Sequence, residues 1–246
     1  IYKCIEVINV GRFPNIAASK AKTGAAKAKV YSGYAKEIYS IAKQGGTDPN
    51  GNLNLRHLIE KAKKEQVPAD VIKRAIDKVN SGADESYTSV RYEGFASGGA
   101  TVMVDCLTDN VNRTVSLVRN AFTKSKAKMG VSGCVSHMYE HLSVIVVKNM
   151  TEDEVIEALL MGEVDAKEID AADDNVSIYG DPSDLYKIKD ALTNMKPDVE
   201  FIVDEVTYLP NETVLLEGED KENFDKLISM LDDVEDVQKV YHNVVI

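Results

Sequence analysis

Three carboxylates, Glu93, Asp105 and Asp109, lie in and beside an apolar stretch of the sequence. Grouped carboxylates can hold a divalent metal ion that activates water for phosphoester hydrolysis. They also have a structural interpretation, in which Asp109 caps the helix that follows and the other two bond to backbone groups or to Arg91. Their spacing lends no support to a metal site, so the structural interpretation is favoured and the catalytic one stays an alternative.

Cys134, His137 and His141 form a second group, with a spacing that resembles that of zinc ligands. On a strand, however, residues 134 and 137 would point to opposite faces, and no fourth ligand is apparent. The sequence also contains no phosphate-binding glycine loop, nucleophile elbow or nucleophilic Cys-His signature. We therefore predict a protein that is not an enzyme and that uses no metal and no cofactor.

Residues 108–114 (TDNVNRT) hold more hydrogen-bonding side chains than the start of one helix requires. Amides and a guanidinium at a helix N-terminus suit the recognition of phosphate or backbone groups. An elaborate cap joined to a network between domains explains the same residues, and spacing does not decide between the two. The residues in question are Asn110, Asn112, Arg113 and Thr114.

Charge is distributed unevenly along the chain. Residues 11–80 carry 14 Lys and Arg against 6 Asp and Glu, whereas residues 81–246 carry 14 against 33. A basic segment in an acidic protein favours contact with a polyanion such as nucleic acid, and lysine and arginine would supply a salt-sensitive grip on phosphate. The candidate nucleic-acid-binding residues are Lys20, Lys22, Lys27, Lys29, Lys36, Lys43, Arg56, Lys61, Lys64, Lys73 and Arg74.

The basic segment has the apolar periodicity of three short helices, at about residues 16–43, from about 53 and over 69–80. Tyr31 and Tyr34 fall on the apolar stripe of the first helix, so core packing is favoured over base stacking for them. The lysines at 22, 29, 36 and 43 recur every seven residues and so share the opposite face. An ordinary solvated helix face is the competing explanation of this stripe.

Beyond residue 82 the period changes to that of strands. Residues 143–204 read as β-α-β-β-α-β, which is the ferredoxin-like order. The strands and helices on either side could complete one another as a split domain. We therefore predict a multi-domain α and α+β protein, with a three-helix head at 11–81, a split α+β domain at 82–142 plus 205–246, and an inserted ferredoxin-like domain at 143–204.

The remaining composition narrows the class of protein. The three cysteines form no C-x-x-C pair, which argues for a reducing compartment. No run approaches the roughly 18 apolar residues that a membrane span needs. We expect a cytoplasmic protein that contacts no membrane and takes no small-molecule substrate.

Several ordered motifs resemble one known family. The motifs are KQGGTDPNGNLNLRHLIEKAKKEQVP, DVIKRAIDK, RYEGF, LTDNVNRT, GCVSHMY and DVEDVQKVYHNV. They resemble the YebC family, in its YeeN-like branch, which also includes the mitochondrial translational activator of cytochrome oxidase. The resemblance implies an N-terminal three-helix bundle and two α+β domains, one inserted in the other.

The resemblance also implies a function in gene expression. Members of the family have been described as DNA-binding transcriptional regulators and as ribosome-associated factors that help translation of proline-rich stretches. We expect a non-enzymatic translation factor that binds ribosomal RNA, with ribosomal proteins as additional partners, and we keep a DNA-binding transcriptional regulator as the alternative. Residues 81–246, which we call the acidic body, would hinder binding to duplex DNA because their negative charge repels phosphate. In addition, no recognition helix is evident in the sequence.

Overall fold

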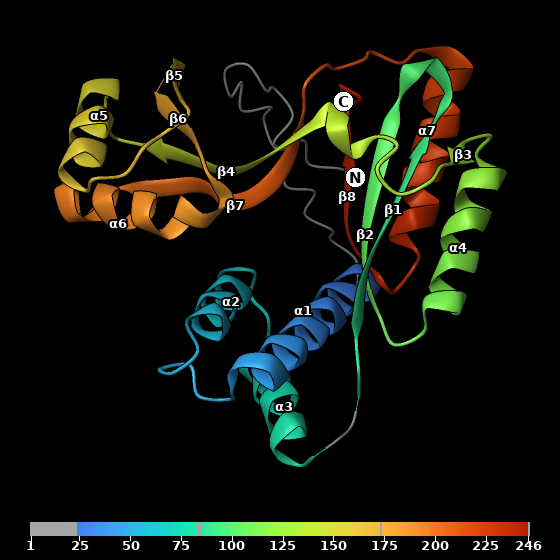
Figure 1. The fold of residues 1–246 in the computed structure, drawn as a ribbon, viewed down its shortest axis with the longest axis horizontal. Coiled ribbons are helices and arrows are strands. Elements are labelled where there is room, and N and C mark those ends of the chain that lie inside the picture. The colour runs from blue at the N-terminus through green and yellow to red at the C-terminus, as the bar shows by residue number, and fades with distance from the viewer. Residues whose placement is uncertain (1–23, 83–84, 173, 246) are drawn as a thin grey trace. The chain divides into compact units, whose positions relative to one another are not determined.

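The computed structural model describes residues 24–82, 85–172 and 174–245, which form two compact units. One unit contains residues 136–216 with 243–245, and the other contains residues 24–135 with 217–242. The chain therefore leaves one unit for the other and later returns (Figure 1). None of the helices in these ranges has the length and apolar character that a membrane crossing requires.

The head of the second unit consists of three helices, α1 (Gly24–Gly45), α2 (Leu53–Lys64) and α3 (Ala69–Asn80). Each helix contributes to one buried core, in which Ile38, Leu55 and Ile72 meet. Tyr31 and Tyr34 pack against this core, which confirms their predicted place. The predicted start of the first helix, from residue 16 to residue 23, lies outside the described residues.

A buried asparagine makes the turn between the first two helices. The Oδ1 atom of Asn52 accepts the backbone N–H of Leu55 at 3.1 Å and so caps α2. Its Nδ2 atom donates to the carbonyl oxygens of Gly46 at 2.9 Å and Ile41 at 3.2 Å. One side chain thus satisfies backbone groups at the end of α1 and at the start of α2.

The rest of the second unit is a four-stranded sheet with two helices. Its strand order is β3-β1-β2-β8, where β1 is Thr88–Phe95, β2 is Thr101–Thr108, β3 is Lys128–Met129 and β8 is Val237–His242. Helices α4 (Val111–Lys124) and α7 (Gly218–Asp232) lie on the same face of this sheet (Figure 1). A Cβ atom on Gly94 would lie 2.4 Å from the ring of Phe122, so the glycine lets α4 approach β1 closely.

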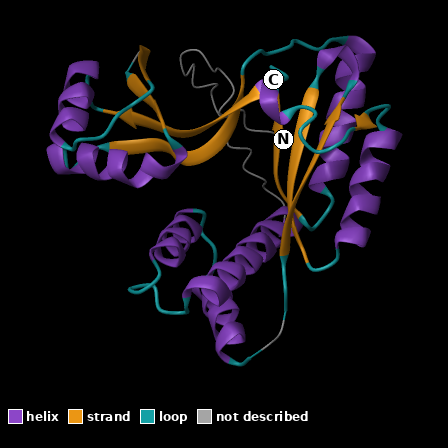
Figure 2. Cartoon of the chain, viewed as in Figure 1, coloured by secondary structure: helices purple, strands orange, loops and turns teal. Residues whose placement is uncertain are grey.

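The first unit has the ferredoxin-like order that the sequence predicts. Its elements run β4 (Tyr139–Lys148), α5 (Glu152–Met161), β5 (Glu168–Ala172), β6 (Asn175–Gly180), α6 (Leu185–Met195) and β7 (Glu200–Pro210). All strand pairs are antiparallel, in the order β5-β6-β4-β7. Ile145 and Ile178 of the sheet form one core with Val155 of α5 and Ile188 of α6. Figure 2 shows both helices on the same side of the sheet.

The predicted fold class is confirmed, and three local details differ. Residues 131–138 form turns and a short 3₁₀ helix instead of a strand, and β4 begins only at Tyr139. Val214, in the stretch after residue 204 where strands and helices were expected, makes only an isolated bridge to Val244. The helix after β2 is capped by Asn110 rather than by Asp109. The residue boundaries of the three predicted domains stay a prediction.

Candidate nucleic-acid interface

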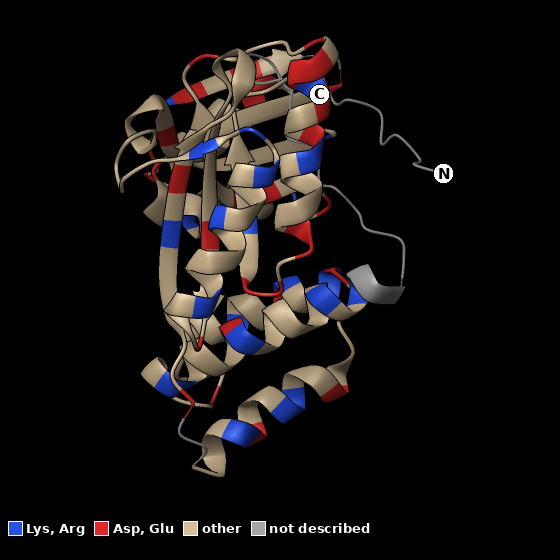
Figure 3. Ribbon diagram, turned by 90° about the vertical axis from the view of Figure 1, so that its right-hand side faces the viewer, with Lys and Arg blue, Asp and Glu red and all other residues tan. Residues whose placement is uncertain are grey.

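Exposed basic side chains are concentrated on α2 and α3. The five predicted contact residues on these helices are all exposed, and Lys63 is exposed as well; the five are Arg56, Lys61, Lys64, Lys73 and Arg74. Figure 3 shows the positions of Lys and Arg along the backbone in blue. Arg74 forms an ion pair with Asp70 one turn earlier. Arg56, Lys61 and Lys73 form no hydrogen bond or ion pair in the described part of the chain, although Lys61 acts electrostatically on the Glu37 carboxylate. These three are therefore available to bind phosphate.

The predicted lysines of the first helix lie in different surroundings. Lys20 and Lys22 lie outside the described residues. Lys27 is exposed on α1. Lys43 is exposed as well, but its Nζ atom donates to the carbonyl oxygen of Glu85 at 2.7 Å and lies 5.8 Å from the centre of the Tyr39 ring.

Lys29 and Lys36 correct the interpretation of the lysine stripe. Their spacing does place them on one face of α1, but that face contacts the segment between α7 and β8. Lys29 donates to the carbonyl oxygen of Asp232 at 2.5 Å. Burial lowers the pKa of Lys29, against the raising effect of the nearby Asp232 and Asp233 carboxylates. Because both amines already have intramolecular partners, they no longer belong among the free phosphate contacts.

Asp236 is the centre of the contact between the head and the neighbouring sheet domain. Only 3% of its side chain is exposed, and it accepts a hydrogen bond from Lys36 Nζ at 3.0 Å. From α4, Arg113 Nη2 lies 2.8 Å and Thr114 Oγ1 lies 2.9 Å from the same carboxylate. One carboxylate thus binds groups from α1 and α4, and we call these four residues the clasp.

The pKa of Asp236 reflects this balance of forces. Burial acts to raise the pKa, but hydrogen bonds from Arg113, Lys36 and Thr114 together outweigh it and lower the pKa to about 2. The same contacts raise the pKa of Arg113, with help from Asp109. Asp236 therefore stays ionised at any pH at which the protein is expected to work.

Most of the surplus polar groups at residues 108–114 bond within the protein. Asn110 accepts the backbone N–H of Arg113 at 3.0 Å, and Thr108 Oγ1 lies 2.8 Å from Thr114 Oγ1. Arg113 also reaches Asp109 at 2.6 Å. Asn112 differs, because its side chain is exposed and has no partner in the described residues. The contacts correspond to a cap joined to a network between domains, and the role of the segment in recognition stays a prediction.

The three carboxylates considered for metal catalysis have structural partners. Asp105 forms a two-pronged ion pair with Arg91, at 2.6 and 2.8 Å. Glu93 is buried and accepts the backbone N–H groups of Gly133 at 2.9 Å and Val135 at 2.8 Å. Within the described ranges, no three His, Cys, Asp or Glu side chains are grouped so that they could hold a metal ion.

The cysteine and histidines of the second group do not share a strand. Cys134 lies in a turn, and burial raises the pKa of its thiol. His137 lies in the 3₁₀ helix that precedes β4, while His141 lies on β4 and stacks on Tyr208 with ring centres 4.3 Å apart. Cys134 and His137 therefore do not lie on one strand, and the expectation that they point to opposite strand faces was wrong.

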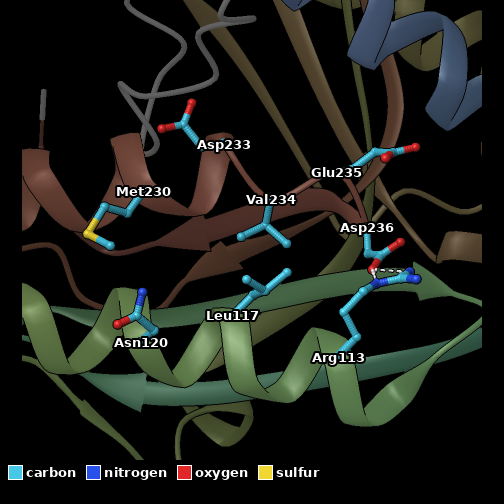
Figure 4. Close-up of a pocket in the computed structure, with 8 residues that line it drawn as sticks. All are labelled: Arg113, Leu117, Asn120, Met230, Asp233, Val234, Glu235 and Asp236. Atoms are coloured by element: carbon cyan, nitrogen blue, oxygen red, sulfur yellow. Dashed lines mark hydrogen bonds and ion pairs between the residues drawn. The ribbon is translucent and has the colours of Figure 1, made fainter.

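An open groove of about 400 Å³ lies between α4 and α7 (Figure 4). Leu117, Met230 and Val234 supply its apolar lining, and Arg113 and Asp236 meet at one end of it. The groove is also lined by Asp233 and Glu235. The groove thus contains three acidic side chains and one arginine, which is already paired with Asp236. It therefore suits neither phosphate nor nucleic acid.

The clasp predicts a specific dependence of stability on acid. Asp236 has a lowered pKa in the folded state, so its contribution is complete above its unfolded pKa near 4 and is lost as the pH falls toward 2. We expect the free energy of unfolding to fall by about 2 kcal/mol more between pH 5 and pH 2 in the native protein than in Asp236→Asn. Urea unfolding at both pH values measures this, and equal losses would contradict it.

The structural roles of two residues in this region are not apparent from the sequence. Asp236 lies in an acidic run with no local signal that distinguishes it. Glu93 was considered only as a metal ligand or as a partner of local groups, whereas it holds a loop about 40 positions away. The role of such a buried carboxylate can be recognised only when the folded structure shows which groups it contacts.

Family models match nearly the whole of this chain. The N-terminal domain of the TACO1/YebC protein matches residues 11–82, and the second and third domains of TACO1/YebC match residues 87–244. A solved structure of a conserved hypothetical protein from Aquifex aeolicus has a TM-score of 0.76 and 36% identity, covering 96% of this chain and 97% of that one.

Curated relatives are similar along almost their full length. A protein of Pseudoalteromonas atlantica is 50% identical over 92% of this chain and 93% of its own. One of Vibrio cholerae is also 50% identical, over 92% and 95%, and one of Shewanella oneidensis is 48% identical, over 94% and 96%. Each is named a probable transcriptional regulatory protein. On this evidence the chain belongs to the TACO1/YebC family.

Proposed function

We propose that this protein is a non-enzymatic regulator of gene expression that binds nucleic acid in the cytoplasm through its head. The observation that carries this proposal is a set of exposed cations on α2 and α3 that form no hydrogen bond or ion pair in the described residues, Arg56, Lys61 and Lys73, in a protein with a net charge of −11. Cations that have no partner in the protein give up no ion pair when they bind phosphate.

Ribosomal RNA is the proposed target. The acidic body restricts any long, straight polyanion to one narrow approach, because the rest of the surface repels it. Folded RNA on a ribosome presents phosphates in many directions, with basic ribosomal proteins beside them that suit the acidic body. The resulting function is that of a translation factor, and help with the synthesis of proline-rich stretches is the activity that the family resemblance favours.

Regulation of transcription through duplex DNA is the second candidate. The names of the relatives favour it, since each is called a probable transcriptional regulatory protein. The head would then bind the same phosphates along a duplex, with little base readout from its lysines.

One experiment separates these candidates. The purified protein is sedimented with ribosomes across a series of salt concentrations, with excess duplex DNA as competitor. Ribosome binding that survives the DNA is the result expected for a translation factor. Transfer of the protein to the DNA would make transcriptional regulation the better conclusion, and failure to bind either polymer would refute nucleic-acid binding altogether.

A further inference from the structure

One stretch of the acidic body contains no acidic residue. Residues 110–139 include five Lys and Arg and no Asp or Glu, although residues 81–246 together carry a net charge of −19. In the structure this acid-free segment comprises α4, β3 and the loop that follows β3. Residues 110–135 of this segment belong to the same unit as the head, and residues 136–139 belong to the other unit.

The exposed face of α4 is polar and largely unpartnered. The buried face of the helix includes Val118 and Phe122, while the exposed residues recur at helical spacing: Asn112, Ser116, Arg119, Asn120 and Thr123. The two hydroxyl groups donate to carbonyl oxygens of α4 itself. The side chains of Asn112, Arg119 and Asn120 have no hydrogen bond or ion pair within the described ranges.

An ordinary solvated helix face does not explain this pattern well. Solvated helices generally pair opposite charges one turn apart. Two other helices of this unit have such pairs: Lys221 pairs with Asp225 on α7, and Arg74 pairs with Asp70 on α3. Around Arg119 the positions one turn away hold only apolar and hydroxyl residues. Arg119 is therefore left for a partner outside the chain, whereas Arg113 of the same helix is held by Asp109 and Asp236.

The loop after β3 presents an apolar residue beside this face. Val131 is 77% exposed, and Gly130, Ser132 and Gly133 around it are also exposed. The loop is nevertheless anchored, because the buried carboxylate of Glu93 accepts two of its backbone N–H groups and the backbone oxygen of Glu93 accepts a third, from Gly130 at 2.8 Å. The anchored backbone therefore holds the exposed Val131 side chain at a fixed position.

The chemistry of these groups selects a nucleic acid with unpaired bases. Arginine and lysine bind phosphate, while the free amide of Asn112 can donate to and accept from base edges. Residues 112–123 of a helix extend over about 16 Å, which is longer than one phosphate group and fits a polymer. The exposed Val131 can contact a base only if that base is unstacked.

We propose that the exposed face of α4 and the loop at residues 130–133 form a second nucleic-acid contact, which binds an unpaired RNA segment. This inference rests on the proposed function and adds to it the kind of nucleic acid that the body contacts. The head then supplies phosphate affinity, and the α4 face supplies selectivity for unpaired nucleotides.

The test uses the full chain and a labelled single-stranded RNA of about twelve nucleotides, with the same sequence as a duplex for comparison. Arg119→Ala with Lys124→Ala should weaken binding of the single strand about 25-fold at about 0.1 M salt and reduce the slope of log K against log salt by about 1.4. Asn112→Ala should weaken binding without changing that slope, because an amide releases no counterion. If the native protein binds the duplex as tightly as the single strand, the proposed selectivity for unpaired nucleotides is wrong.

A matched control removes the same charge from the neighbouring helix. Lys221→Ala with Lys226→Ala on α7 should leave binding within about threefold of the native value, because these lysines lie among acidic residues. If the α4 variant binds like this control while a head variant loses binding, the second contact is refuted and the proposed function stands. If the native protein binds neither RNA nor ribosomes, the proposed function fails first.

Discussion

Reversing three charges of the head, with Arg56→Glu, Lys61→Glu and Lys73→Glu in one variant, should weaken ribosome binding about 100- to 500-fold at about 0.1 M salt. About six phosphate contacts predict a slope of log K against log salt near −4 for single strands and near −5 for duplex, and three fewer contacts flatten it by about 2 to 3. Sedimentation at several salt concentrations measures both quantities.

The choice of residues follows from the structure. All three side chains are exposed and form no hydrogen bond or ion pair in the described part of the chain, so we expect their replacement to leave the packing of the head unchanged. Reversing Lys29, Lys36 and Lys43 instead would also break contacts with residues 232–236 and with Glu85. Loss of binding in that variant would report a disturbed fold as much as a lost phosphate contact.

The control is a variant with the same change in net charge elsewhere. Lys148→Glu, Lys187→Glu and Lys226→Glu lie outside the head, and together they should weaken ribosome binding by no more than about threefold, since distant charges are screened. Equal losses in the two triple variants would mean that net charge, and not the head surface, determines binding. A head variant with native affinity and slope would remove the basis of the proposed function.

The elements of the fold could largely be predicted, because their signals are local. The stripe of Tyr31, Tyr34 and Ile38 shows the helical period, and the alternation after residue 82 shows that of strands. The errors occur where contacts with other residues determine the local structure. Asp109 and Asn110 are both good capping residues, and the ion pair of Asp109 with Arg113 leaves the cap to Asn110.

The candidate site could be predicted only in part. Helical spacing correctly placed Lys29 and Lys36 on one face of α1, but nothing in their sequence neighbourhood shows what covers that face. The partner of Lys36 lies 200 positions away along the chain, and that of Arg113 lies 123 positions away. Sequence periodicity therefore identifies which residues share a face, and only the folded chain shows which of those faces remain open to a ligand.

The clasp gives the largest expected effect on stability. Asp236→Ala should lower the free energy of unfolding by about 3–5 kcal/mol, because it leaves Lys36, whose side chain is 13% exposed, as a charge without its buried partner. Thr114, which is fully buried, loses an acceptor as well. Urea unfolding at pH 7 measures the loss, and amide hydrogen exchange should show faster exchange in α1 than in α5 of the other unit.

Two further variants separate the buried charge from a general effect of mutation. Glu235→Ala removes a carboxylate that is 69% exposed and lies 3.4 Å from Lys36, and it should cost less than about 1 kcal/mol. Adding Lys36→Met to Asp236→Ala should restore part of the stability, because no unpaired charge then remains in the contact. A double variant that is less stable than Asp236→Ala, or a single variant as mild as Glu235→Ala, would show that Asp236 does not hold the head in place.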